Sequence, residues 1–362
     1  MASAPDDARF MAAAIRLSLW NLGRTSTNPS VGCLIVKDGV IVGRGVTAPG
    51  GRPHAEPQAL ADAGEHARGA TAYVTLEPCS HHGKTPPCAN ALIAAGVARV
   101  VVSVTDPDTR VSGRGLRMLE EAGISVTTGV LEEEGRRALA GYLTRQTKAR
   151  PQVILKLAVS TDGMIGRQGA GQVAITGPVA RGQVQVLRSQ TDAILVGIGT
   201  ALADDPLLNV RLEGLEAYSP IRIVLDRRLE LLLDSKLVSS ASTVPVIVVG
   251  DGQPRPGYAD RKASLQAKGV EVLEVDRPEA LLSALADRGI SSVLVEGGAR
   301  VAAEWLSADL VDEIHLYEGS GTVGEGGIPS PVTPGTVPPG FRKIRSAVLG
   351  GDRLCVFERD GP

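Results

Sequence analysis

Short apolar runs alternate with helical patterns along the first 145 residues. Runs that favour strands span residues 31–36, 40–43, 72–76, 99–104 and 124–128, and helical patterns span 55–63, 89–95 and 116–121. Lys37, Asp38 and Gly39 separate the first two runs, which predicts a β-hairpin. An alternation of this kind is typical of a sheet covered by helices.

The second half of the chain shows the same alternation. Strand-like runs span 153–159, 193–196, 221–225, 244–249, 270–275 and 293–295, and helical patterns span 179–188, 278–287 and 300–306. Residues 319–340 are rich in Gly and Pro, which predicts a loop. Between the halves, residues 132–137 are highly charged and residues 145–151 are polar and end in proline. We therefore expect two α/β domains, residues 1–148 and 149–362.

Length and charge narrow the classes of protein. A chain of 362 residues suits about two domains. Its 38 Lys and Arg against 40 Asp and Glu leave no basic excess to attract nucleic acid or a membrane surface. The apolar runs are far shorter than the roughly 18 residues of a membrane span, and the acidic first residues do not resemble a secretory signal. We expect a cytoplasmic protein with no nucleic-acid or membrane partner.

The four cysteines are too few for a disulfide scaffold. Cys33 and Cys355 lie in β-prone apolar segments and are expected to be buried core thiols. The other two form a pattern with a histidine, because His54, Cys79 and Cys88 supply the three protein ligands of a zinc ion that activates water.

Zinc nucleobase deaminases share an H-x-E motif followed by P-C-x-x-C, and the Glu of that motif carries protons. Here Glu56 follows His54 by two residues, but Cys79 and Cys88 enclose eight residues rather than two. The longer insert adds histidines and Lys84, which suit a phosphorylated substrate. The alternative is that both cysteines are buried apolar residues and His54 is a loop histidine. His81 and His82 are equally read as a solvated loop.

Residues 10–150 resemble the cytidine-deaminase fold, and the segment 77–88, E-P-C-S-H-H-G-K-T-P-P-C, resembles the bifunctional deaminase/reductases of riboflavin biosynthesis. The resemblance implies a three-layer N-terminal domain that binds zinc and uses Glu56 as a catalytic residue. It also implies substrate contacts from Asn28 and Lys84, although Asn28 alone is equally an ordinary turn residue.

Gly-rich turns follow two of the expected strands in the second half, at residues 197–200 and at Gly297 and Gly298. Neither matches G-x-G-x-x-G, which disfavours a Rossmann dinucleotide site. Such turns can still hold phosphates where a following helix leaves its first N–H groups free, and each is otherwise a plain turn.

Residues 151–360 resemble the reductase half of the same family, which has a dihydrofolate-reductase-like α/β fold and uses NADPH. By position, the resemblance implies NADPH contacts from Ala158, Thr200, Asp204, Gly298, Ala299, Arg300, Val301, Ala302, Ala303 and Glu304, and substrate contacts from Arg188, Leu208, Arg211 and Glu296. Arg188 and Arg211 can hold a sugar phosphate with forked hydrogen bonds, or form solvated salt bridges. Lys156 lies in an apolar strand, where an ammonium is costly unless it faces a site, and is our candidate for assisting the reduction.

The chain departs from this family just before the helical pattern at 179–188. The family pattern there is E-S-x-W-I-T; Ile175 and Thr176 fix the register, so Ala174 stands in place of the Trp and Gln172 in place of the Ser. We expect Ala174 to border the cofactor in a looser slot and Gln172 to hydrogen-bond the substrate.

Together these features imply two steps of riboflavin synthesis on a diaminopyrimidinone that carries a ribosylamino 5-phosphate: a zinc-dependent deamination and an NADPH-dependent reduction of ribosyl to ribityl. The resemblance also implies a homo-oligomer, a dimer through the reductase domain. Two alternatives are a tRNA or nucleoside deaminase fused to a non-catalytic module, and a regulatory protein on a dead deaminase fold. The lack of basic excess disfavours tRNA, and the presence of Glu56 disfavours a dead fold.

Overall fold

The computed structural model describes residues 4–80, 86–108 and 112–360. The chain divides into two compact units, an N-terminal unit of residues 1–149 and a C-terminal unit of residues 150–362. Each unit has its own sheet and its own hydrophobic core.

The described residues of the N-terminal unit form one five-stranded sheet in the order β2-β1-β3-β4-β5. Its strands are β1 (Gly32–Lys37), β2 (Val40–Val46), β3 (Thr71–Leu76), β4 (Arg99–Val104) and β5 (Ser125–Thr127). The expected hairpin joins β1 and β2, which pair antiparallel. Strands β3, β4 and β5 run parallel to one another, so their carboxyl ends lie at one edge of the sheet.

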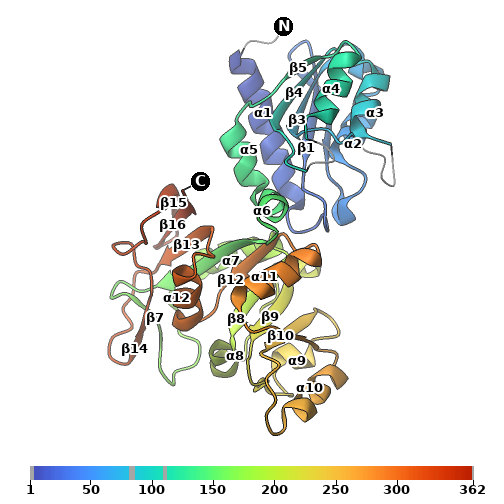
Figure 1. The fold of residues 1–362 in the computed structure, drawn as a ribbon. Coiled ribbons are helices and arrows are strands. Elements are labelled where there is room, and N and C mark those ends of the chain that lie inside the picture. The colour runs from blue at the N-terminus through green and yellow to red at the C-terminus, as the bar shows by residue number, and fades with distance from the viewer. Residues whose placement is uncertain (1–3, 81–85, 109–111, 361–362) are drawn as a thin grey trace. The chain divides into compact units, whose positions relative to one another are not determined.

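Helices cover both faces of this sheet and make three layers (Figure 1). Its longer elements are α1 (Ala4–Ser18), α2 (Ala55–Ala63), α3 (Cys88–Ala95), α4 (Arg114–Glu121), α5 (Glu132–Ala138) and α6 (Ala140–Lys148), with short 3-10 turns η1 (Leu19–Asn21), η2 (Pro49–Gly51) and η3 (Gly64–Ala67). Helices α1 and α5 pack on the face that carries Tyr73 and Val101. Helices α2, α3 and α4 pack on the opposite face, which alternate residues such as Ala72 and Val100 form.

The C-terminal unit is built on a nine-stranded sheet in the order β11-β10-β9-β8-β12-β6-β13-β16-β15, as far as its residues are described. The strands of the unit are β6 (Gln152–Val159), β7 (Met164–Arg167), β8 (Ala193–Gly197), β9 (Ile221–Leu225), β10 (Val246–Gly250), β11 (Glu271–Glu274), β12 (Ser292–Val295), β13 (Glu313–Glu318), β14 (Gly327–Pro329), β15 (Phe341–Leu349) and β16 (Asp352–Arg359). All pairs from β11 across to β13 are parallel, whereas β16 and β15 continue the sheet antiparallel.

The helices of this unit also lie on both faces of its sheet. They are α7 (Pro178–Ser189), α8 (Ile198–Asp204), α9 (Lys236–Ser239), α10 (Tyr258–Ala267), α11 (Pro278–Asp287) and α12 (Ala299–Ser307), with the 3-10 turn η4 (Glu216–Tyr218). Helices α11 and α12 bury Leu282 and Trp305 on one face, while α7 to α10 pack on the other. Strand β12 lies between β6 and β8, although it follows both of them in the sequence. Ligands of open parallel sheets bind beside such a reversal of strand order, at the carboxyl ends of the strands.

Several elements differ from the sequence-based expectation. The charged and polar stretch taken as a seam between the domains is helical, because α5 and α6 turn Leu139 and Leu143 into the core of the N-terminal unit. The expected loop 319–340 contains the short strand β14, which pairs with β7. Cys33 is buried, as expected, whereas Cys355 is only partly buried. Within the described residues, no helix is both long enough and apolar enough to cross a membrane.

Candidate active sites

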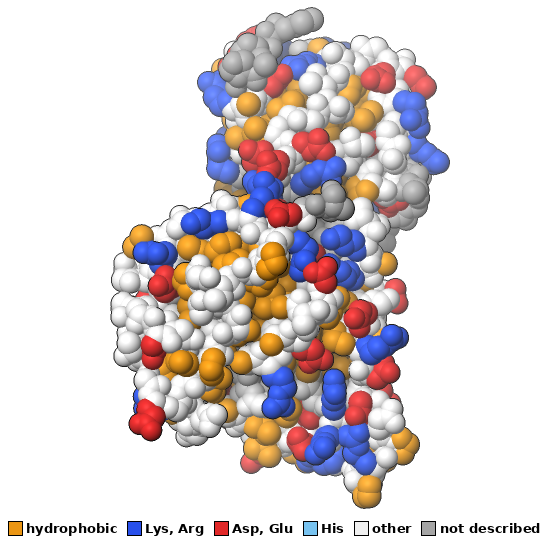
Figure 2. Space-filling view, turned by 60° about the vertical axis from the view of Figure 1, so that its left-hand side comes forward, with side chains coloured by type: hydrophobic (Ala, Val, Ile, Leu, Met, Phe, Trp, Pro, Cys, Tyr) orange, Lys and Arg blue, Asp and Glu red, His pale blue; other side chains and the backbone are white. Residues whose placement is uncertain are grey.

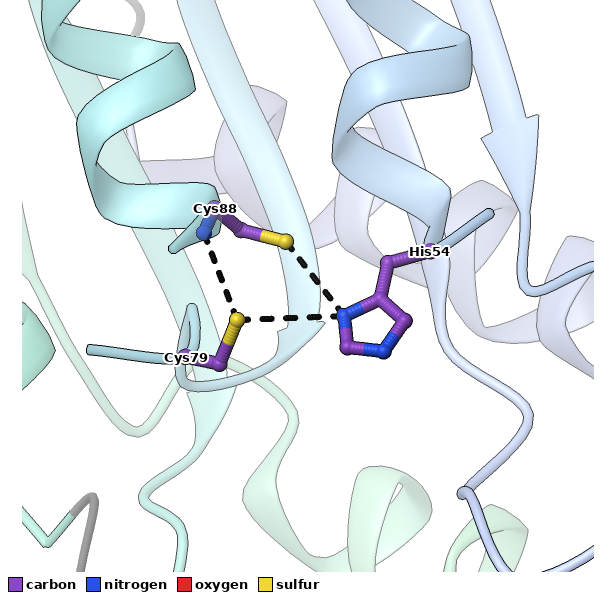
Figure 3. A group of neighbouring side chains, drawn as sticks. All are labelled: His54, Cys79 and Cys88. Carbon is purple, nitrogen blue, oxygen red and sulfur yellow. Dashed lines mark hydrogen bonds between the residues drawn. The ribbon is translucent and has the colours of Figure 1, made fainter. Parts of the chain in front are cut away.

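Three side chains of the N-terminal unit converge on one point (Figure 3). His54 directly precedes α2, Cys79 follows β3, and Cys88 is the first residue of α3. Nitrogen Nδ1 of His54 lies 3.8 Å from the sulfur of Cys79 and 3.4 Å from the sulfur of Cys88. The structure therefore brings together the three residues that the sequence predicts as metal ligands.

The positions of these three atoms fit a zinc ion. Each residue offers one ligand atom, and the three atoms lie within 4.8 Å of one another. A tetrahedral zinc, with bonds of about 2.0 Å to nitrogen and about 2.3 Å to sulfur, separates these two atom types by about 3.5 Å. The two nitrogen–sulfur distances lie on either side of that value. Three protein ligands leave a fourth position for water, as in zinc sites that do chemistry.

Electrostatics at this cluster favour metal binding and proton transfer. Hydrogen bonds with Cys88 and His54 lower the pKa of the Cys79 thiol to about 4, and the backbone N–H of Cys88 also donates to its sulfur over 3.3 Å. Cys79 is therefore a thiolate, the form that ligates metals. Burial, together with the nearby Cys79, raises the pKa of Glu56 to about 7. A carboxyl group that titrates near neutral pH can both accept and return a proton.

Glu77 holds the loop that carries Cys79, a role that the sequence analysis missed. Its buried carboxylate accepts hydrogen bonds from the backbone N–H groups of Asp106 (3.3 Å), Gly113 (3.0 Å) and Gly115 (3.2 Å). A side chain at Gly115 would place its Cβ 2.1 Å from the carbonyl oxygen of Pro78. The start of α4 is thus fixed against the residue next to Cys79.

The expected substrate contacts of this unit are only partly described. Asn28 is half-buried, and its amide packs so close to Gly51 that a Cβ there would lie 2.4 Å from its nitrogen. Gly51 lies three residues before His54, so Asn28 borders the segment that leads to the metal cluster. Lys84, with His81 and His82, lies outside the described residues.

A cavity of about 1750 Å³ opens in the C-terminal unit, at the carboxyl ends of β8 and β12. The residues expected at cofactor or substrate that line it are Lys156, Ala158, Gln172, Ala174, Arg188, Thr200, Asp204, Leu208, Arg211, Glu296, Gly298, Ala299, Arg300, Val301 and Glu304. Ala302 and Ala303 do not line it, because α12 turns Ala302 into the core and Ala303 away from the cavity. The reversal of strand order thus gathers residues that are more than a hundred positions apart.

Backbone atoms shape the middle of the cavity. A Cβ at Gly297 would lie 2.5 Å from Cα of Val196, so the loops after β8 and β12 touch. Gly298 has a φ of 52° and precedes α12, and no side chain caps the first N–H groups of that helix. Free N–H groups at the start of a nine-residue helix suit the diphosphate of a dinucleotide. These observations fit the predicted cofactor.

A buried cluster of charges forms one wall of the cavity. Arg188 donates from Nε and a terminal nitrogen to the two oxygens of Glu296, over 2.7 and 2.9 Å. Nζ of Lys156 lies 3.9 Å from the same carboxylate and faces the ring of Tyr317. The forked hydrogen bonds that we expected Arg188 to make with a sugar phosphate are therefore made with Glu296. Arg211 remains as the arginine whose charge is available at this end of the cavity.

The small side chain of Ala174 gives a direct test of the cofactor slot. Ala174 is exposed and lines the cavity. Ala174→Trp is expected to tighten NADPH binding, because an indole adds a large flat apolar face that alanine lacks. Titration of the variant with NADPH measures this, and Ala303→Trp, on the exposed side of α12 away from the cavity, is the control. Unchanged affinity in a folded Ala174→Trp protein would mean that another side chain already fills the slot.

Comparison with known proteins places both units. The model of the "cytidine and deoxycytidylate deaminase zinc-binding region" matches residues 4–104, and the model of the "RibD C-terminal domain" matches residues 151–354. The riboflavin biosynthesis protein RibD of Escherichia coli is 43% identical over 323 residues, which cover 86% of this chain and 87% of that protein. The chain belongs to the RibD family. RibD of Aquifex aeolicus is 39% identical and covers 88% of each chain.

Solved structures of RibD proteins have the same fold. RibD of Acinetobacter baumannii superposes with a TM-score of 0.86 at 36% identity, over 99% of this chain and 100% of that one. A diaminohydroxyphosphoribosylaminopyrimidine deaminase/5-amino-6-(5-phosphoribosylamino)uracil reductase of Thermotoga maritima superposes with a TM-score of 0.85 at 34% identity, over 98% and 99% of the two chains.

Membership in the RibD family confirms the expected fold class, a cytidine-deaminase-like domain followed by a reductase domain. The chain is a bifunctional deaminase and reductase of riboflavin biosynthesis, with zinc and NADPH as its cofactors. Its substrate is a small phosphorylated pyrimidine.

Proposed function

We propose that residues 1–148 deaminate 2,5-diamino-6-ribosylamino-4(3H)-pyrimidinone 5′-phosphate and that residues 149–362 reduce the ribosyl group of the product to ribityl. The observation that carries the proposal is the convergence of His54, Cys79 and Cys88 at zinc-ligand distances beside the buried Glu56. The deaminase/reductase named for the Thermotoga maritima structure supports the substrate.

In the deaminase, His54, Cys79 and Cys88 would hold the metal. When bound, zinc supplies a water molecule whose pKa is lowered towards roughly 7. Glu56 takes a proton from the attacking water at its carboxylate and gives it to the amine as the carbon–nitrogen bond breaks, so that ammonia leaves. The raised pKa of Glu56, about 7, suits both transfers.

In the reductase, the Gly298 turn and the start of α12 would hold the dinucleotide. When bound, NADPH supplies a hydride to C1 of the ribosyl group. Lys156 holds a proton at Nζ for the ring oxygen that is released when the C1–oxygen bond breaks. The carboxylate of Glu296 keeps Lys156 in place, and Arg188 fixes that carboxylate from its other side. Arg211 faces the substrate, and Gln172 offers it an amide.

The two activities can be measured separately on one protein preparation. With the diaminopyrimidine substrate, we expect ammonia release first and NADPH consumption only after deamination. We expect about one zinc per chain, and Cys88→Ala should lose both the zinc and ammonia release while it still consumes NADPH with deaminated substrate. Cys355→Ala is the matched control, because this cysteine lies in β16, outside both sites. A Cys88→Ala protein that keeps zinc and ammonia release would refute the ligand assignment.

The surroundings of the protein are also part of the proposal. A cytoplasmic location is supported by thiolate ligands and free cysteines, which persist where thiols stay reduced. The absence of a nucleic-acid partner is supported by the net charge of −2 and by the mixture of basic and acidic side chains on the face seen in Figure 2. A gel shift with tRNA tests the nucleoside- or tRNA-deaminase alternative.

A dimer through the C-terminal unit is supported by its edge strand. Strand β15 ends the sheet, and Val348 on it is 78% exposed, as is Val179 to 55% beside the β15–β16 turn. Figure 2 shows hydrophobic side chains gathered on one face of this unit. Light scattering on the full chain and on Val348→Asp tests the dimer, and a monomeric mass for the unchanged protein would refute it.

A further inference from the structure

The cavity of the C-terminal unit has a second end, away from Lys156 and Glu296. Leu225, Val249, Val275 and Leu281 line it there, at and after the carboxyl ends of β9, β10 and β11 and on α11. Flat apolar walls of this kind suit a purine ring. The sequence analysis assigned no residue to this end.

Three arginines border the same end. Arg227 and Arg228 follow β9, and Arg277 precedes α11; all three line the cavity and are exposed. Three cations from two separate loops lie where a cavity with apolar walls opens to solvent. A pair of adjacent arginines after a strand is the sequence signal that could have found them.

The turn that carries Arg227 and Arg228 is fixed by hydrogen bonds. The backbone N–H of Asp226 donates to the carbonyl oxygen of Val249 over 2.9 Å. Its buried carboxylate accepts from the backbone N–H of Leu231 over 2.8 Å. Because both ends of the turn are tied to the sheet, the two guanidinium groups start from a preorganised backbone.

The carboxylates nearby leave positive charge available. Arg227 lies 3.6 Å from Glu304 and Arg277 lies 3.7 Å from Asp276, and both pairs are largely exposed, so each is weak. The side chain of Arg228 has no hydrogen-bond or ion-pair partner in the part of the chain that the structure describes. Glu230 also lines this end and is the remaining acidic neighbour.

We propose that Arg227, Arg228 and Arg277 bind the 2′-phosphate of NADPH and thereby select NADPH over NADH. The inference rests on the proposed placement of the dinucleotide in this cavity. A phosphomonoester with about two negative charges is the group for which arginine forks are suited. The diphosphate is assigned instead to the start of α12, where Arg300 lies in the first turn. The adenine then lies against the apolar walls, with the 2′-phosphate beside the three arginines.

Equilibrium titration of the full-length protein with NADPH and with NADH tests the assignment through binding rather than turnover. Arg228→Ala is expected to weaken NADPH binding about tenfold or more and to leave NADH binding within about twofold, because only NADPH carries the phosphate. Arg228→Lys is expected to fall between, since it keeps the charge without the fork. NADPH binding by the unchanged protein should also weaken more with added salt than NADH binding.

Two matched variants separate the outcomes. Arg300→Ala is expected to weaken both dinucleotides alike, because both carry the diphosphate. Arg16→Ala removes an exposed arginine from α1, in the N-terminal unit, and is expected to change neither. Equal losses for NADPH and NADH in Arg228→Ala would overturn the 2′-phosphate assignment and leave the cofactor cavity standing. Binding of neither dinucleotide by the unchanged protein would overturn the cavity assignment itself.

Discussion

Glu56→Gln is expected to keep its zinc and to lose ammonia release by about a hundredfold to ten-thousandfold. Glutamine has nearly the shape of glutamate but cannot take up and return a proton, and general acid–base groups contribute rates of this size. His54, Cys79 and Cys88 are unchanged, so the metal should stay. Metal analysis and an ammonia assay on the same sample measure the two effects.

The reductase provides an internal control for this variant, because NADPH consumption with deaminated substrate should be unaffected. Glu65→Gln is the matched substitution, since Glu65 is an exposed glutamate in the turn η3, close behind α2. Near-normal deamination by Glu56→Gln, or loss of its zinc, would remove Glu56 from the role of proton carrier.

Lys156→Met is expected to lower NADPH consumption by about a hundredfold or more while deamination continues. Methionine fills a similar volume in the strand but offers no proton to the sugar oxygen. Arg188 still pairs with Glu296, so the wall of the cavity should keep its shape. The loss should appear in kcat, with the affinity for NADPH retained. Lys343→Met, on the exposed edge strand β15, is the matched control.

The pH dependence of the unchanged reductase gives a second measurement of the same role. Burial lowers the pKa of Lys156, although Glu296 opposes the shift. A group with a lowered pKa loses its proton at a lower pH, so the reduction rate should decline on the alkaline side before a free lysine would titrate. A rate that stays flat through that range would argue that another group supplies the proton.

The zinc site could be predicted from the sequence because its geometry is local. His54 and Cys88 each stand at the start of a helix, and Cys79 directly follows a strand, so short motifs fix their backbone positions. The role of Glu77 could not be predicted. Its partners are backbone N–H groups about thirty or more residues away, and a backbone group leaves no mark in a sequence.

The reductase cavity was only partly predictable for a topological reason. Lys156 and Glu296 meet because β12 inserts between β6 and β8, and no local pattern announces that order. Family resemblance supplied most of the lining residues. It could not show that Arg188 is held by Glu296, because the partner of an arginine depends on the packing of the folded chain.

The elements that were missed have weak or misleading patterns. Helix α1 begins in an acidic segment, yet it buries Phe10, Met11 and Ile15 on one side. Strand β15 carries charged residues along an edge that faces solvent, so it lacks the apolar run of a central strand. In both cases the signal lay in one face of the element rather than in its average character.

The contact between Gly297 and Val196 has a consequence for how this enzyme can vary. Most of the cavity is lined by side chains, which substitution can enlarge, shrink or recharge one at a time. At Gly297 the lining is main chain on main chain, and any added carbon would have to displace the end of β8. Gly199, two residues beyond the end of β8, has open space around it and an ordinary backbone angle. In a library of growth-selected variants, position 297 should therefore stay glycine while position 199 accepts many residues.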